Sequence, residues 1–256
     1  MATLHLQRDQ PDGVPPLALT GERTLPDVPE ENYWFRRHLV VYEWISGLVA
    51  GKHVIDMACG EGYGADVLAR AAAGVVGVDA NPEAHEHARL RYPRPNLRFT
   101  RDLVETFSET ADAVVFLQTI EHLSDARGAL AHLRSLVGDR GTVFLSTPNV
   151  LTLAPRGASR SGNPWHVHEY RAEEFEQLCR ASFATVDMHG LFHARKLRAH
   201  ELALRVGWDG VHRRLGLTRR FYDWFTPAIA VSDFALRPAA DADLDRALDF
   251  VAVCRS

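Results

Sequence analysis

The first side chains suited to chemistry lie around a glycine-rich turn at residues 54–64, which read VIDMACGEGYG. An apolar run ends at the carboxylate of Asp56, and Gly60 and Gly62 follow within six residues. Glycine permits a sharp turn and a close approach to a ligand, and a helix expected over 62–72 would point its N-terminus at that ligand. The pattern predicts a strand that delivers its end to a nucleotide-like ligand. The turn also fits a relaxed dinucleotide fingerprint, which leaves a nicotinamide cofactor open.

Three further segments carry polar groups that a bound nucleoside would need. Asp79 ends a second β-branched run, 23 residues after Asp56, and suits the ribose diol. Asp102 and Leu103 follow a third predicted strand and suit the amino group and ring face of adenine. A fourth predicted strand runs into Gln118 and the sequence QTIEHL.

In this order and spacing, the four segments resemble the class I S-adenosylmethionine-dependent methyltransferases. The resemblance rests on DMACGEGYG, GVDANP, the Asp-Leu pair and IEHL. It implies a Rossmann-like α/β fold and S-adenosyl-L-methionine as cofactor, and Ala58 stands where the family commonly has glycine. The cofactor contacts implied or expected are Asp56, Ala58, Cys59, Gly60, Gly62, Asp79, Ala80, Asp102, Leu103, Gln118 and Tyr42, the last from an N-terminal helix.

The chain also resembles a narrower, actinobacterial group of methyltransferases along nearly its whole length. That resemblance rests on TGERTLP, ENYWFRRH, STPN, NPWH and GLFH. The group includes one relative associated with methylglucose lipopolysaccharide synthesis, and the resemblance to it implies transfer to a sugar hydroxyl, for instance of a polysaccharide. His168 replaces an arginine and Asp102 an asparagine of that relative, so the acceptor is the part of the function that the resemblance specifies least.

Methyl transfer to a hydroxyl needs a base, and histidines are the first candidates. His166, in NPWHVHEY after the fifth predicted strand, is the favoured base, and His122 with Glu121 is the second. Each histidine can instead anchor its loop. Two histidines without a clear third ligand are weak evidence for a metal, so no metal is predicted.

An amphipathic helix expected over 31–49 presents aromatic and cationic groups within two turns. Such groups stack on sugar rings or contact a cofactor, although one stripe of the helix must be buried. The predicted acceptor contacts are Tyr33, Trp34, Arg37 and His38 on this helix, together with Trp165, His168 and His193 farther along the chain.

Strand and helix patterns alternate after residue 51 and predict a seven-stranded, mostly parallel sheet with a late antiparallel hairpin. We expect an unstructured leader at 1–20, a cap helix within 21–50 and a methyltransferase domain over 51–256. Residues 194–247 form an insert before the last strand. We interpret it as a lid over the acceptor, with an outward-facing dimer arm as the alternative.

Composition excludes several classes of function. A net charge of −4 and a pI near 6.3 disfavour nucleic acid as a partner. The three cysteines are not spaced as a metal motif and cannot all pair, which predicts reduced thiols and a cytoplasmic protein. No apolar run is long enough for membrane insertion. The expected partner is a small-molecule or oligosaccharide acceptor, and a homodimer stays open.

The sequence therefore predicts S-adenosylmethionine-dependent methyl transfer, by in-line displacement with a histidine base, to a hydroxyl of a saccharide or glycosylated metabolite. One alternative is a methyltransferase for a non-sugar natural product with an oxygen or nitrogen acceptor. A non-catalytic cofactor-binding partner subunit is another, and a nicotinamide oxidoreductase is the last.

Overall fold

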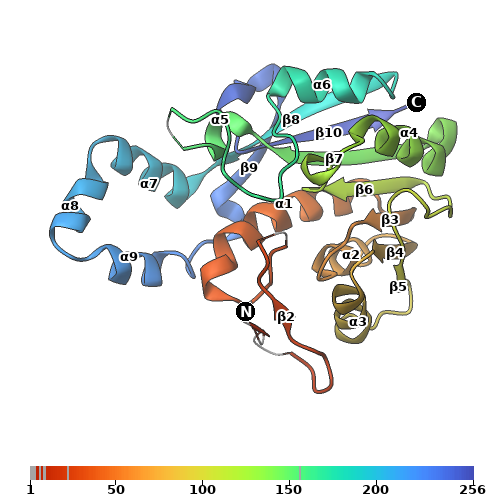
Figure 1. Ribbon diagram of the computed structural model, residues 1–256, viewed down its shortest axis with the longest axis horizontal. Coiled ribbons are helices and arrows are strands. Elements are labelled where there is room, and N and C mark those ends of the chain that lie inside the picture. The colour runs from red at the N-terminus through yellow and green to blue at the C-terminus, as the bar shows by residue number, and fades with distance from the viewer. Residues whose placement is uncertain (1–3, 6, 8–9, 22, 156) are drawn as a thin grey trace.

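An eight-stranded sheet forms the centre of the computed structural model, which describes residues 4–5, 7, 10–21, 23–155 and 157–256. The strand order is β5-β4-β3-β6-β7-β10-β8-β9 (Figure 1). The strands are β3 (His53–Met57), β4 (Gly74–Asp79), β5 (Leu97–Arg101), β6 (Ala113–Leu117), β7 (Thr142–Pro148), β8 (Thr185–His193), β9 (Phe234–Pro238) and β10 (Asp249–Arg255). Strands β3 to β7 are mutually parallel, which confirms the predicted Rossmann-like architecture.

The late antiparallel pair is also confirmed. β10 lies between β7 and β8 and runs antiparallel to both. The eighth strand, β9, was not predicted; it lies within the expected insert and pairs antiparallel with β8. It ends at Pro238, which lacks a backbone donor, and it occupies the edge of the sheet, where such a residue is tolerated.

Helices cover both faces of the sheet, as Figure 1 shows. On one face, α1 (Asn32–Leu48) and α2 (Tyr63–Leu68) bury Ile45 and Leu68. On the other, α4 (Ala126–Val137) and α6 (Ala172–Arg180) bury Leu130 and Phe175. Burial of each such side chain contributes roughly 1.5–3 kcal/mol, so the two layers fix the sheet between them.

The chain reverses its direction of travel across the sheet at β3. One neighbour of β3 is β4, with β5 beyond it, and the other is β6, with β7 beyond it. In open α/β sheets, ligands bind outside the carboxyl ends of the strands at such a switch point. The fold thus places the glycine-rich turn, which follows β3, at the expected binding position.

The N-terminal segment differs from the unstructured leader expected over 1–20. Its described residues include β1 (Leu4–His5) and β2 (Leu17–Ala18), which pair antiparallel, whereas residues 1–3, 6, 8 and 9 lie outside the described residues. Leu17, Leu25 and Val28 form a small buried cluster. The proline-rich composition of the segment predicts no regular structure. Its apolar side chains become buried only when the segment folds back on the domain.

The insert forms three helices that extend from the body of the protein on the left of Figure 1. They are α7 (Arg195–Arg205), α8 (Trp208–Arg214) and α9 (Thr218–Phe225). The amide of Ala194 donates to the carbonyl of Asp233 at 2.7 Å, so the arm leaves and returns at one point. We call residues 195–232 the arm.

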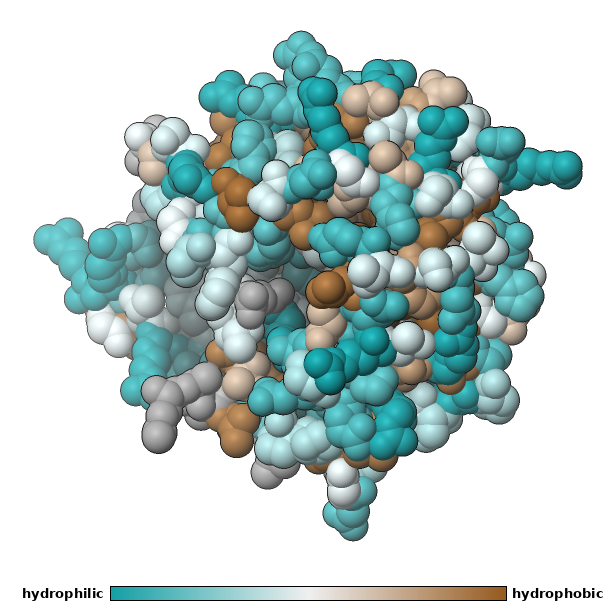
Figure 2. All heavy atoms as spheres, turned by 45° about the vertical axis from the view of Figure 1, so that its right-hand side comes forward, coloured by the Kyte–Doolittle hydropathy of each residue, from teal (hydrophilic) through white to brown (hydrophobic). Residues whose placement is uncertain are grey.

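The surface in Figure 2 is mostly hydrophilic, with hydrophobic residues in separate groups. Within the described part of the chain, none of the helices combines the length and the apolar character that a membrane crossing requires.

Candidate functional site

A cavity of about 620 Å³ opens at the carboxyl ends of the parallel strands, within the size range of small-molecule sites. Its walls come from the glycine-rich turn, the ends of β4, β6 and β7, helix α1 and two loops. The predicted site residues that line it are Trp34, His38, Tyr42, Ala58, Cys59, Gly60, Asp79, Ala80, Gln118, Glu121, His122 and His166. Sequence reasoning thus named 12 of the 25 described residues that line the cavity.

The turn after β3 is held by the carboxylate at the end of β4. Asp79 accepts hydrogen bonds from the backbone amides of Gly60, at 2.8 Å, and Asn81, at 2.9 Å. Each carboxylate oxygen has a second lone pair, so Asp79 keeps acceptor capacity for a ligand hydroxyl. Gly60 has a φ of +56° and Ala58 a φ of +58°, a left-handed conformation that explains why glycine suits the position of Ala58.

Gly62 and Gly64 serve packing. A Cβ on Gly62 would lie 2.7 Å from the Cβ of Ala88, on α3 (Pro82–Arg91). A Cβ on Gly64 would lie 2.2 Å from the ring of Tyr42. Gly62 does not line the cavity, and its contact with the cofactor stays a prediction.

Asp56 lies behind the cavity wall and is fully buried. Its Oδ1 accepts from the Tyr42 hydroxyl at 3.1 Å, whereas its Oδ2 has no hydrogen-bond partner among the described residues. Burial raises the pKa of Asp56 to about 8. A buried carboxylate oxygen without a partner suits a cationic group, such as the ammonium of a bound amino acid. Tyr42 lines the cavity and Asp56 does not, so the contact of Asp56 with the cofactor stays a prediction.

His166 forms a dyad with a residue that sequence reasoning missed. Its Nδ1 lies 2.8 Å from Oε1 of Glu169, and its Nε2 lies 3.1 Å from Nδ2 of Asn163. Ser161 donates to Glu169 through its amide, at 2.8 Å, and through its hydroxyl. Burial alone would raise the pKa of Glu169, but the hydrogen bonds from Ser161 and His166 lower it below its ordinary value. An ionised Glu169 keeps the proton on Nδ1 and the lone pair on Nε2.

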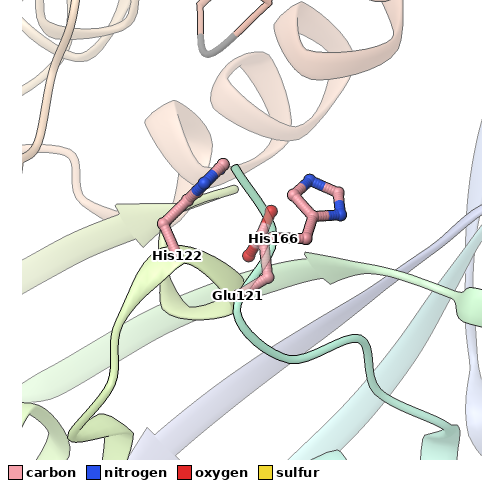
Figure 3. A group of neighbouring side chains, drawn as sticks. All are labelled: Glu121, His122 and His166. Carbon is pink, nitrogen blue, oxygen red and sulfur yellow. The ribbon is translucent and has the colours of Figure 1, made fainter. Parts of the chain in front are cut away.

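Glu121 and His122 lie in a 3-10 turn (Ile120–His122) after β6, beside His166. Figure 3 shows the Glu121 carboxylate between the two imidazoles. One ligand atom from each of the three residues lies within 4.8 Å of the others, close enough to hold a metal ion after a small movement. Burial raises the pKa of Glu121 to about 8, and Thr147 donates to its Oε2 at 3.0 Å.

Helix α1 contributes Trp34 and His38 to the cavity, and burial lowers the pKa of His38 to about 4. Arg37 is not at the cavity. Its guanidinium bonds both carboxylate oxygens of Asp249, at 2.7 and 2.6 Å, and is buried. The predicted acceptor contact at Arg37 is thus corrected to an ion pair that joins α1 to β10, because the buried stripe of the helix includes this position.

Tyr33 and His193 also lie outside the cavity wall, where the Tyr33 hydroxyl is 2.9 Å from Nε2 of His193. His168 packs its ring on Tyr170, with 4.4 Å between the ring centroids. These three predicted acceptor contacts are not brought to the cavity with His166.

Two more predicted groups lie outside the wall. Asp102 accepts from the amide of Leu103 and the hydroxyl of Thr106, and the side chain of Leu103 is 53% exposed. Trp165 donates from Nε1 to the carbonyl of Thr20 at 3.2 Å. That bond joins the loop after β7 to the N-terminal segment.

Several wall residues were not predicted. The described ones are Gly21, Arg23, Thr24, Glu31, Glu61, Tyr63, Asn81, Leu117, Thr119, Pro148, Leu153, Ser161 and Asn163. Glu61 is buried and bonded to Gln7 at 2.9 Å and to Tyr92 at 2.8 Å, a long-range network with no local pattern. By contrast, none of the described residues of 194–247 lines the cavity, so the lid role of the insert stays a prediction.

Comparisons with known proteins agree with this architecture. Residues 33–195 match the methyltransferase domain family. A probable S-adenosylmethionine-dependent methyltransferase of Mycolicibacterium smegmatis is 39% identical over 95% of this chain and 97% of its own. A ubiquinone biosynthesis O-methyltransferase of Albidiferax ferrireducens is 34% identical over 54% of this chain and 63% of its own.

Solved structures share the fold at low sequence identity. An S-adenosylmethionine-dependent methyltransferase from Thermotoga maritima matches with a TM-score of 0.57 and 14% identity, over 88% of this chain and 94% of its own. Another, from Archaeoglobus fulgidus, matches with a TM-score of 0.56 and 12% identity over the same shares.

Proposed function

The chain belongs to the methyltransferase domain family of S-adenosylmethionine-dependent enzymes, and from this we propose that it methylates a hydroxyl group of a saccharide or glycosylated metabolite. The His166–Glu169 dyad at the wall of the cavity is the observation that carries the proposal. An alkyl hydroxyl is a poor nucleophile at neutral pH, and a carboxylate-held imidazole is the group that activates it.

When bound, S-adenosylmethionine supplies a methyl group already activated by the positive charge of its sulfonium. Asp79 would bind the ribose hydroxyls, and Asp56 with Tyr42 would receive the ammonium of the amino-acid end. Cys59, Ala80 and Gln118 complete this side of the wall. The main tasks left to the chain are to align the acceptor oxygen with the methyl carbon and to remove a proton.

His166 removes that proton. The acceptor hydroxyl replaces Asn163 as the partner of Nε2 and gives its proton to that nitrogen as the oxygen–carbon bond forms. The bound cofactor would supply the methyl carbon and take up the electron pair of its carbon–sulfur bond as a neutral thioether. Glu169 stabilises the imidazolium through Nδ1. His38 is a weaker candidate, because burial lowers its pKa to about 4.

A sugar acceptor fits polar and aromatic groups among the residues that line the cavity. Trp34, 37% exposed, offers a ring face for a pyranose, and His38 and His122 offer hydrogen bonds. The resemblance of the sequence to the actinobacterial group with a relative associated with methylglucose lipopolysaccharide synthesis also supports a sugar acceptor. The relatives named for ubiquinone biosynthesis favour a second candidate, a phenolic acceptor, whose lower pKa would make the histidine base less important.

Cofactor binding is tested by calorimetric titration with S-adenosylmethionine, S-adenosylhomocysteine and NAD. We expect binding of the two sulfur compounds only, and weaker binding by Asp79→Ala. Preference for NAD would overturn the assignment of the site.

The base is tested by the formation of S-adenosylhomocysteine with a panel of mono- and oligosaccharides and phenols. With a saccharide acceptor, His166→Ala should lower kcat by about 10² to 10⁴ while cofactor affinity stays unchanged. Glu169→Gln should give a smaller loss of kcat. Full activity of His166→Ala on a sugar would reject the base, and activity confined to phenols would favour the second candidate.

A further inference from the structure

We propose that Glu121, His122 and His166 bind a divalent transition-metal ion. The three ligand atoms lie within 4.8 Å of one another, and all three residues line the cavity. The centroids of the two imidazole rings are 5.0 Å apart (Figure 3).

The geometry requires only a modest contraction. In a tetrahedral site with metal–nitrogen distances near 2.1 Å, ligand atoms are about 3.4 Å apart. Side-chain rotations that bring the atoms together by an ångström or so would form the site. The backbone is already fixed nearby, because the amides of Val167 and His168 donate to the carbonyl of Glu121 at 2.8 and 3.1 Å.

Both imidazoles are oriented as metal-binding histidines usually are. Nδ1 of His122 lies 2.9 Å from the carbonyl oxygen of Trp165, which can only accept, so this nitrogen carries the hydrogen. Nδ1 of His166 donates to Glu169 at 2.8 Å. A metal-bound histidine typically donates its other ring N–H to a carbonyl or carboxylate, as these two do, which leaves Nε2 of each ring as the metal-binding nitrogen. The ion would displace the Asn163 amide, whose Nδ2 lies 3.1 Å from Nε2 of His166.

The third ligand, the carboxylate of Glu121, is buried without a positively charged partner among the described side chains. Glu121 is 1% exposed, and it forms no ion pair with any side chain in the described part of the protein. Thr147 gives one neutral hydrogen bond to Oε2. A cation bound between this carboxylate and the imidazoles would compensate the cost of burying its charge.

Two imidazoles and one carboxylate select the kind of ion. Zn²⁺, Co²⁺ and similar ions accept this set, whereas Mg²⁺ and Ca²⁺ prefer oxygen ligands alone. Three protein ligands leave at least one coordination position for water or an acceptor oxygen.

The kinetic consequence rests on the proposed function. A metal on Nε2 of His166 occupies the lone pair that accepts the proton, so the ion should inhibit transfer and compete with the acceptor. It should not compete with the cofactor, whose proposed contacts at Asp56 and Asp79 lie outside the cluster.

The test uses full-length protein without a histidine tag, freed of metal by EDTA and dialysis, and titrated with Co²⁺ and Zn²⁺. We expect one equivalent of Co²⁺ with the visible absorption of a low-coordinate site, and calorimetric binding of Zn²⁺. Glu121→Gln, His122→Ala and His166→Ala should each weaken binding at least tenfold. His168→Ala, which removes an imidazole two residues from His166, is the matched control and should bind as the wild type.

Absence of stoichiometric binding, or equal loss in the control and the cluster variants, would overturn the metal site and leave the base proposal intact. Activity separates the two proposals. Turnover that persists in EDTA and is inhibited by Zn²⁺ supports both. Turnover that requires the ion keeps the metal site and rejects His166 as the base.

Discussion

Ala58 carries the only strained backbone position among the described residues of the glycine-rich turn that is not a glycine, with a φ of +58°. The left-handed conformation costs a non-glycine residue about 1–2 kcal/mol. Glycine avoids this cost, but its greater freedom in the unfolded chain offsets part of the resulting gain in stability. We expect Ala58→Gly to raise the free energy of unfolding by about 0.5–1 kcal/mol, measured in urea. Ala65→Gly, in helix α2, is the control and should destabilise. A neutral or negative result for Ala58→Gly would show that the turn is not strained.

Asp56 should make stability depend on pH. Its folded pKa of about 8 exceeds its ordinary value of 3.8, mainly through burial, and the groups that face it are Tyr42, Asp79 and Cys59. Between these values the folded protein holds a proton that the unfolded chain releases, so stability falls as pH rises. From pH 6.5 to 8, cofactor-free wild type should lose about 1.5 kcal/mol more than Asp56→Asn.

The difference between wild type and variant isolates Asp56 from other groups, such as Glu121, that titrate in both proteins. Burial lowers the pKa of His38 from its ordinary value of 6.5 to about 4, so His38 makes stability rise with pH between these two values. The range therefore begins at pH 6.5, above the titration of His38. An equal change in the free energy of unfolding between pH 6.5 and 8 in the two proteins, measured in urea, would contradict a raised pKa at Asp56.

At this scale the sequence predicted residues whose roles follow from local spacing. Asp79 ends β4 and Gly60 follows β3, and their position in the cavity follows from the parallel sheet. Glu169 was missed although it lies three residues from His166, because only the folded loop shows that its carboxylate turns toward Nδ1. Arg37 was misplaced because helical spacing alone does not tell which stripe of a helix is buried.

At the scale of elements, the Arg37–Asp249 pair fixes α1 to β10. Arg37 also donates to the carbonyl of Leu248 at 2.7 Å. Removing one member of a buried pair leaves an uncompensated charge, so Arg37→Ala should cost about 3–5 kcal/mol in urea unfolding. The double variant Arg37→Met with Asp249→Leu should recover most of that loss. A loss of less than about 1 kcal/mol in the single variant would show that solvent reaches the pair.

The main elements were predictable because each has its own periodicity. β4, β6 and β7 contain short apolar runs, and α4 and α6 have one apolar stripe each. β9 and the β1–β2 pair were not predictable, because each is short and is stabilised by a part of the chain far away in sequence. β9 pairs with β8, and the N-terminal segment that contains β1 and β2 is bonded to Glu61.

At the scale of the whole molecule, the arm exposes apolar side chains that a single copy of the chain leaves in water. Val206 is 87% exposed, Leu215 65% and Trp224 69%. Of the two roles considered for the insert, these exposures favour contact with a second copy over a lid. We expect a homodimer in sedimentation equilibrium, and Val206→Ser with Leu215→Ser should shift it to monomer with unchanged affinity for S-adenosylmethionine. A wild type that is monomeric at all concentrations would contradict the dimer arm.

The position of β10 has a consequence for the order of events during synthesis. β7 and β8 do not pair with each other; β10, the last strand in the sequence, lies between them. The five parallel strands can assemble while the chain is still being translated, but β8 and β9 cannot join them until residues 249–255 emerge from the ribosome. Until then, the edges of β7 and β8 are unpaired and can form incorrect strand pairs, so we expect a chaperone to bind the chain at these edges.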